Sequence, residues 1–316
     1  MLRLVLAVGL LSLGASCGAS ETDNYPESVE EASTLPAAPP ASNARLVVSA
    51  DVDTTDVNAE TLDTFRQILA DASTDQVADR SYGEIVQWVG EQLIGRPYVA
   101  GMLDAPDEET LVVDLTGFDC VLYVENVLAM ASMIALGQTD YATYAANVQT
   151  MRYRDGELAY CSRLHYFSDW IRDNERRGAV QDVTASVGGE PFEKEIRFMT
   201  ENRDAYRQLA DDSAYACVVD MEAGLAGAEL FYVPQNRIAE VYDTLQPGDV
   251  IATATSIGGL DVTHTGFVHK TSENTGFMHA SLSSDAVKVS DDLEAYVQGI
   301  SSQIGIVIAR PVDPRG

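Results

Sequence analysis

The chain has 316 residues with 49 acidic against 20 basic side chains, a formal net charge of −29 at pH 7. A field of that sign repels nucleic acids and anionic membrane surfaces, which excludes nucleic acid as a partner. Lysine occurs only at Lys194, Lys270 and Lys288, and such an acidic, lysine-poor surface favours adaptation to a saline habitat over a functional use of the charge.

Residues 1–20 have the pattern of an export signal. Arg3 precedes the apolar run Leu4–Leu13, and small residues lead to Cys17. The run is too short for a membrane span, which takes about 20 apolar residues. The pattern is similar to a bacterial lipoprotein signal with Cys17 as the lipidated N-terminus, although Gly14 stands where such signals usually carry leucine. We expect an exported protein, lipidated or simply secreted, in the periplasm or on the outer membrane of a bacterium, with membrane contact only through Cys17.

Residues 21–44 are rich in Glu, Ser, Pro and Ala and lack aliphatic periodicity, so they predict a disordered tether. No linker-like segment or fixed repeat interrupts residues 45–316, which predicts a single domain there.

Helices are expected in the first half of that domain. Apolar residues recur every three to four positions in the segments 62–70, 82–93, 121–136 and 166–175. The third segment is the clearest helix, with Asp119 placed to cap its start and Gly137 to end it.

Strands are expected later. Short β-rich segments separated by Gly, Asn, Ser or Asp cover 249–255, 262–269, 276–281, 286–289 and 304–310. Strands so close in sequence normally pair as antiparallel neighbours. The predicted fold class is α+β, with N-terminal helices packed on one face of a C-terminal antiparallel sheet.

Cys120 falls in the first turn of the clearest helix, where free backbone N–H groups and the helix dipole favour an anion. This position predicts a thiol pKa lowered from about 8.5 toward neutrality, and N–H donors for an oxyanion. A nucleophilic thiolate is one interpretation of Cys120, and a buried core thiol is the other.

Two of the four histidines are placed to serve such a thiol. His264 is expected on a strand face shared with Gly266, whose missing side chain would leave room for substrate, and we take it as the base. His279, on the next strand, would orient the His264 ring. His269 is expected at the surface, and His165 lies in a polar and aromatic cluster that could line a pocket.

At these residues the chain resembles the NlpC-type cell-wall hydrolases, bacterial enzymes of a minimal papain-like thiol hydrolase fold, and more narrowly their N-acetylmuramoyl-L-alanine amidase-like branch. The matching motifs occur in the family's order over about residues 80–311: 95–99 (GRPYV), 118–120 (FDC), 124–126 (VEN), 151–156 (MRYRDG), 162–170 (SRLHYFSDW), 248–251 (GDVI), 259–266 (GLDVTHTG) and 279–281 (HAS).

The resemblance implies a Cys120, His264 and His279 triad, with the Tyr98 hydroxyl near the nucleophile. It also implies that the branch's distinctive insert binds the sugar or the peptide carboxylates, through Arg152, Ser162, Arg163, His165 and Tyr166. The alternative for the insert is a structural polar network around a long loop.

The implied reaction is cleavage of the amide between the muramic-acid lactyl group and L-alanine in muropeptides, including anhydro forms. A γ-D-glutamyl-diamino-acid endopeptidase and a non-catalytic muropeptide-binding lipoprotein remain alternatives. No cofactor or metal is expected, because zinc, phosphate-loop and dinucleotide motifs are absent from the sequence. Asp51, Asp53 and Asp56 resemble the start of a calcium loop but lack its glycine and final glutamate.

Two cysteines remain after Cys17 and Cys120 are assigned. In an exported protein Cys161 and Cys217 can form a disulfide or stay free, and the sequence does not supply the geometry that decides between these states.

Overall fold

The computed structural model describes residues 57–316. The predicted export signal, the tether, Cys17 and the acidic residues Asp51, Asp53 and Asp56 therefore lie outside the described residues. No helix within 57–316 is both long enough and apolar enough to cross a membrane.

All four predicted helices are present: α1 (Ala59–Thr74), α2 (Tyr82–Gln92), α3 (Cys120–Leu136) and α5 (Phe167–Arg176). Their ends follow from local chemistry. The Asp119 side chain accepts from the Leu122 N–H at the start of α3, and Gly137 ends that helix in the left-handed conformation. Ser81 and Glu84 form a capping box at the start of α2.

Several short or weakly patterned helices were not predicted. They are α4 (Tyr141–Arg152), α6 (Phe198–Glu201), α7 (Asp212–Leu225) and α8 (Leu293–Gln298). Single turns of 3-10 helix lie at Val77–Asp79, Met102–Asp104, Arg154–Gly156, Tyr160–Ser162, Arg203–Ala205, Arg207–Ala210 and Ile238–Val241.

The five predicted strands are confirmed as β4 (Val250–Thr255), β5 (Val262–Lys270), β6 (Thr275–Ser281), β7 (Ala286–Ser290) and β8 (Gln303–Pro311). Three short strands join them: β1 (Val180–Asp182), β2 (Glu190–Pro191) and β3 (Phe231–Pro234). The sheet order is β2-β3-β8-β4-β5-β6-β7, with β1 also on β8, and the strand pairs are antiparallel.

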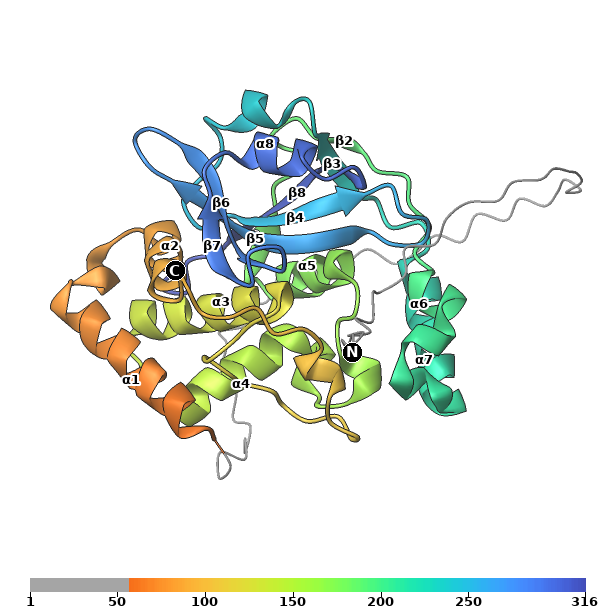
Figure 1. Cartoon of the computed structure of the whole chain (residues 1–316), viewed down its shortest axis with the longest axis horizontal. Helices are drawn as coiled ribbons and strands as arrows, with labels where there is room; N and C mark the ends of the chain where they lie inside the picture. The colour runs from red at the N-terminus through yellow and green to blue at the C-terminus, as the bar shows by residue number, and fades with distance from the viewer. Residues whose placement is uncertain (1–56) are drawn as a thin grey trace, which may run out of the picture. The chain divides into compact units, whose positions relative to one another are not determined.

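The sheet separates two apolar layers, because side chains alternate along each strand. Phe267 and Met278 pack with α2 and α3 in the larger core, whereas Val268 and Phe277 pack with Leu293 of α8 on the opposite face. Figure 1 shows α2, α3 and α5 on one side of the sheet and α8 on the other. The N-terminal helices pack on one face of the sheet, as predicted. The other face is covered by α8, which was not predicted because six residues are too few to show helical periodicity.

A third apolar cluster lies between α6, α7 and the segment before α5, and includes Tyr166, Leu209 and Val218. Cys161 and Cys217 form a disulfide here with a Cα separation of 5.8 Å, within the range that such bonds require. The bond ties α7 to the chain just before His165.

Candidate active site

Cys120 is the first residue of α3, and its sulfur lies among backbone donors. The backbone N–H groups of Cys120 and Val121 at the start of the helix, and of Thr265 on β5, are close enough to favour the thiolate form. The Asp119 carboxylate beside it accepts the Leu122 N–H at 2.8 Å. Cys120 is the free cysteine of the described residues and is partly exposed.

The expectation of a lowered thiol pKa is wrong. Although part of Cys120 is exposed, protein atoms surround the sulfur densely, and this burial raises its pKa to about 12. The negative charge of Asp119 adds to the increase, and the three backbone N–H groups offset only part of it. Asp119, which caps the helix, therefore also places a negative charge beside the sulfur and disfavours the thiolate. The prediction from helix position alone did not include this charge. At neutral pH the group is a thiol.

The two predicted histidines meet across the sheet. His264 Nε2 lies 2.8 Å from His279 Nδ1, and His279 Nε2 lies 3.2 Å from the Ser290 hydroxyl on β7. This chain of contacts constrains the tautomers. If Ser290 accepts from His279 Nε2–H, then His279 Nδ1 accepts from His264 Nε2–H. His264 Nδ1 then carries a lone pair and can take a proton.

Both rings are held neutral by their surroundings. Burial lowers the pKa of His264 to about 4. Burial also lowers the pKa of His279 to about 3, and the positive charges that His264 and Lys288 can carry add to this decrease. The Phe277 ring stacks on His279 with centroids 4.6 Å apart, and Tyr296 of α8 lies 4.7 Å away. These aromatic contacts leave little freedom for the imidazole to turn.

The pairing between β5 and β6 ends before it reaches His264. β6 pairs with β5 only over Phe267–Lys270, so β5 is free on that side near His264. The pairing with β4 shifts register so that Thr253 faces His264 and Ala254 faces Val262, which leaves Thr263 as the extra residue of a bulge. Bulges commonly redirect side chains beside functional sites.

Gly266 has a different role from the one expected. A Cβ there would lie 2.5 Å from the Met278 carbonyl oxygen and 2.8 Å from His279 Cβ. The missing side chain thus allows β6 to approach and brings His279 to His264, and it does not make room for substrate.

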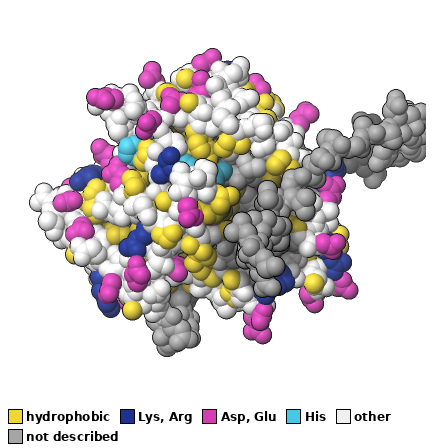
Figure 2. All heavy atoms as spheres, in the orientation of Figure 1, with side chains coloured by type: hydrophobic (Ala, Val, Ile, Leu, Met, Phe, Trp, Pro, Cys, Tyr) yellow, Lys and Arg dark blue, Asp and Glu magenta, His cyan; other side chains and the backbone are white. Residues whose placement is uncertain are grey.

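Cys120 and His264 line one pocket of about 120 Å³. Its other lining residues are Val121, Leu164, His165, Phe167, Leu260, Asp261, Val262, Thr263 and Thr265. His165 Nε2 lies 2.8 Å from the Tyr160 carbonyl oxygen, and burial lowers the pKa of His165 to about 3. Figure 2 shows histidine side chains at the surface of one face, bordered by hydrophobic side chains, with Asp and Glu around its margin.

Tyr98 also lies near the thiol. Burial raises its pKa to about 12, and the negative charges that Cys120 and Asp119 can carry add to that increase. Its backbone pairs with Phe118 in an isolated bridge, which fixes Tyr98 beside the segment that leads into α3.

Two arginines expected to bind substrate are buried in a structural network. Arg152 Nε binds Glu125 at 2.7 Å, and its Nη1 donates to the Val112 carbonyl at 2.6 Å. Arg163 donates to Asp104 at 2.5 Å and to a neighbouring carbonyl. Arg152 is only 1% exposed and Arg163 6%, so neither offers its guanidinium to a ligand in the pocket.

The remaining two expected binding residues are similarly occupied. The Ser162 hydroxyl donates to the Ala159 carbonyl within its own turn. The buried Tyr166 hydroxyl donates to Glu222 at 2.7 Å and accepts from the Met199 N–H at 2.8 Å. Of Tyr98 and the five residues of the insert, His165 lines the pocket and Tyr98 lies near the thiol, whereas the other four are not among the lining residues.

Sequence reasoning missed Thr265, Ser290 and Tyr296. Ser290 lies one residue beyond the predicted strand 286–289, and its contact with His279 depends on how β7 is paired with β6. Within residues 57–316 no group of three or more His, Cys, Asp or Glu side chains is arranged to hold a metal ion.

Comparisons with known proteins agree with this architecture. A model of the AmiA-like, N-acetylmuramoyl-L-alanine amidase-like family matches residues 88–306. The crystal structure of an N-acetylmuramoyl-L-alanine amidase from Bacteroides uniformis is 33% identical and superposes with a TM-score of 0.70, covering 73% of this chain and 99% of that one. A Legionella pneumophila protein shares the fold at 20% identity and a TM-score of 0.60, covering 80% of this chain and 95% of that one. No curated protein matches. The chain belongs to the N-acetylmuramoyl-L-alanine amidase-like family.

Proposed function

We propose that this protein is a peptidoglycan amidase of the papain-like class, which uses Cys120 to cleave the bond between the muramic-acid lactyl group and L-alanine. One observation carries the proposal. A thiol at a helix start and a histidine line the same pocket, and a second histidine at 2.8 Å holds that histidine's Nε2. This is the arrangement of nucleophile, base and orienting group that thiol hydrolases require.

The chemistry follows from the neutral resting state of the two groups. Cys120 gives its proton to His264 Nδ1 as the sulfur attacks the lactyl carbonyl carbon, so no thiolate needs to accumulate. The backbone N–H groups around the sulfur are the candidate donors to the oxyanion.

The same histidine then releases the peptide. His264 protonates the L-alanine nitrogen, the C–N bond breaks, and the lactyl group stays on sulfur as a thioester. Because burial lowers the pKa of His264 to about 4, its protonated form is a strong acid toward an amine. His264 next takes a proton from water as its oxygen attacks the thioester carbonyl carbon. The C–S bond then breaks, the lactyl carboxylic acid is released, and His264 returns the proton to the Cys120 sulfur.

The test is mass spectrometry of purified muropeptides, in reducing-end and anhydro forms, after incubation with the protein and its variants. Peptide that begins with L-alanine should appear with the wild type and be lost with Cys120→Ala and His264→Gln. His269→Gln is the matched control, because His269 lies on the same strand but pairs with Glu91 outside the pocket.

Other products would assign another function. Peptides that lack their L-Ala-D-Glu head would identify a γ-D-glutamyl-diamino-acid endopeptidase. If no substrate is cut but Cys120→Ala binds muropeptides, the protein is a muropeptide-binding lipoprotein.

The proposal also includes export, with Cys17 as the lipidated N-terminus of the mature protein. It is supported by the apolar run and the small residues before Cys17. Mass analysis of the N-terminal peptide from membrane and soluble fractions decides this point: an unlipidated N-terminus elsewhere in the chain contradicts the anchor.

A further inference from the structure

The pocket at Cys120 is small for a muropeptide. It holds about 120 Å³, whereas binding sites for ligands of moderate size span about 300–1,000 Å³. A larger cavity of about 370 Å³ adjoins it, and Asp261 and Val262 line both. The part of the substrate that the first pocket cannot hold has room in the second.

Helix α5 forms a wall of both cavities. Phe167, its first residue, lines the small pocket, and Ile171, Arg172 and Glu175 line the larger one. With a rise of 1.5 Å per residue, Arg172 lies about 8 Å and Glu175 about 12 Å along the helix from Phe167. An extended peptide advances about 3.3 Å per residue, so its third residue comes level with these charges.

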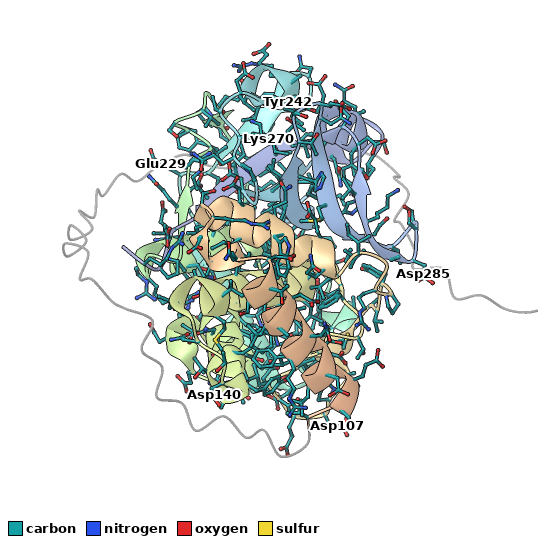
Figure 3. The ribbon with its side chains drawn as sticks, turned by 90° about the vertical axis from the view of Figure 1, so that its left-hand side faces the viewer. Asp107, Asp140, Glu229, Tyr242, Lys270 and Asp285 are labelled. Atoms are coloured by element: carbon teal, nitrogen blue, oxygen red, sulfur yellow. A yellow bond between two sulfur atoms is a disulfide. The ribbon has the colours of Figure 1, made fainter. Side chains whose placement is uncertain are left out.

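The lining of the larger cavity combines an apolar body with both signs of charge. Ile171, Phe192 and Phe231 supply apolar surface, and Arg172 and Glu229 are exposed charged groups of the same cavity. In Figure 3, Glu229 lies at the margin of the molecule, near the level where the sheet meets the helices.

Arg172 is available to a ligand. It makes no ion pair and no side-chain hydrogen bond with another residue of the described range 57–316, whereas its neighbour Arg176 binds Asp155 and Asp173. A guanidinium binds a carboxylate through two parallel hydrogen bonds, and a glutamate accepts from an ammonium group. The cavity therefore suits an aliphatic side chain that ends in both groups.

We propose that this cavity is a subsite for the third residue of the stem peptide, and that it selects a diamino dicarboxylic acid over lysine. Arg172 binds the distal carboxylate and Glu229 the distal ammonium group. The inference rests on the proposed function, because it takes the scissile amide to lie at Cys120.

The test compares three N-acetylmuramoyl substrates by kcat/KM: one with L-Ala-D-Glu only, one extended by lysine, and one extended by a diamino dicarboxylic acid. Arg172→Gln and Glu229→Gln are measured beside the wild type in the full chain. Arg176→Gln is the matched control, since Arg176 lies on the same helix and lines neither cavity.

We expect the wild type to prefer the dicarboxylic substrate over the lysine substrate, and Arg172→Gln to reduce that ratio about tenfold, the effect of one lost charge-assisted hydrogen bond. Glu229→Gln should reduce the ratio of kcat/KM for each tripeptide substrate to kcat/KM for the dipeptide substrate. Arg176→Gln should change neither this ratio nor the ratio between the two tripeptide substrates. A wild type that treats all three substrates alike, or an Arg172→Gln effect equal on all three, overturns the subsite.

Calorimetry with the Cys120→Ala protein separates this inference from the proposed function. If the wild type cleaves nothing but Cys120→Ala binds the dicarboxylic tripeptide more tightly, and loses that preference when Arg172→Gln is added, the subsite stands without the amidase. If the wild type cleaves all three substrates with the same kcat/KM, the amidase stands and the subsite is overturned.

Discussion

The resting state of Cys120 leads to a quantitative prediction about its reactivity. With a pKa of about 12, about one Cys120 in 10⁵ is thiolate at pH 7, against about three in a hundred for an unperturbed cysteine with a pKa near 8.5. A more basic thiolate is intrinsically more nucleophilic, with a Brønsted slope of about 0.4–0.5, which recovers a factor of about 40. The native thiol should thus react with iodoacetamide about a hundredfold more slowly than the unfolded one.

The assay follows carbamidomethylation of the Cys120 peptide by mass spectrometry from pH 6 to pH 9, in native and denatured protein. Reading the Cys120 peptide excludes any contribution from Cys17. The native rate should rise about tenfold per pH unit without a plateau, because protonation keeps the thiolate scarce until the pH approaches 12. Asp119→Asn should increase the rate, since asparagine still caps the helix but removes the adjacent charge.

A different profile would refute this reasoning. A fast native reaction with a midpoint below pH 7 would show that Cys120 and His264 rest as a thiolate and imidazolium pair. In that case the backbone N–H groups would outweigh burial and the Asp119 charge.

Three further results are expected. Ser290→Ala should lower kcat about tenfold with little change in KM, because it removes the group that fixes the His279 tautomer, and Ser290→Thr should restore most of the rate. An alanine variant as active as the wild type across pH 5–9 would contradict this role. Glu125→Ala should destabilise the protein in urea by about 3–5 kcal/mol, because it leaves the buried Arg152 charge unpaired, and an unchanged midpoint would show that this pair contributes nothing. Cys217→Ser should lower the free energy of unfolding by about 4 kcal/mol in the same assay, as loop entropy predicts for a separation of 56 residues from Cys161. The reduced wild type should show the same free energy of unfolding as this variant.

Some elements followed directly from local sequence. The run after Cys120 is apolar throughout and stands between an acceptable cap and a glycine, so its boundaries agree within a residue with those of α3. β4 to β8 are short segments rich in β-forming residues and separated by turn residues, which predicts each strand without reference to its partners. By contrast, α4 mixes Ala, Thr, Gln and Asn with little apolar contrast between its faces, although packing buries most of it.

In the candidate site, too, some features follow from local sequence and others only from tertiary packing. Local sequence was enough to predict that Cys120 begins a helix and that two histidines lie on successive strands, because caps and turns act over a few residues. Tertiary structure alone decided that Ser290 meets His279, that Arg152 is buried on Glu125, and that Asp119 and burial raise the thiol pKa. Contacts between strands depend on register, and pKa values depend on how densely other segments surround a group; both arise only when distant parts of the chain pack together.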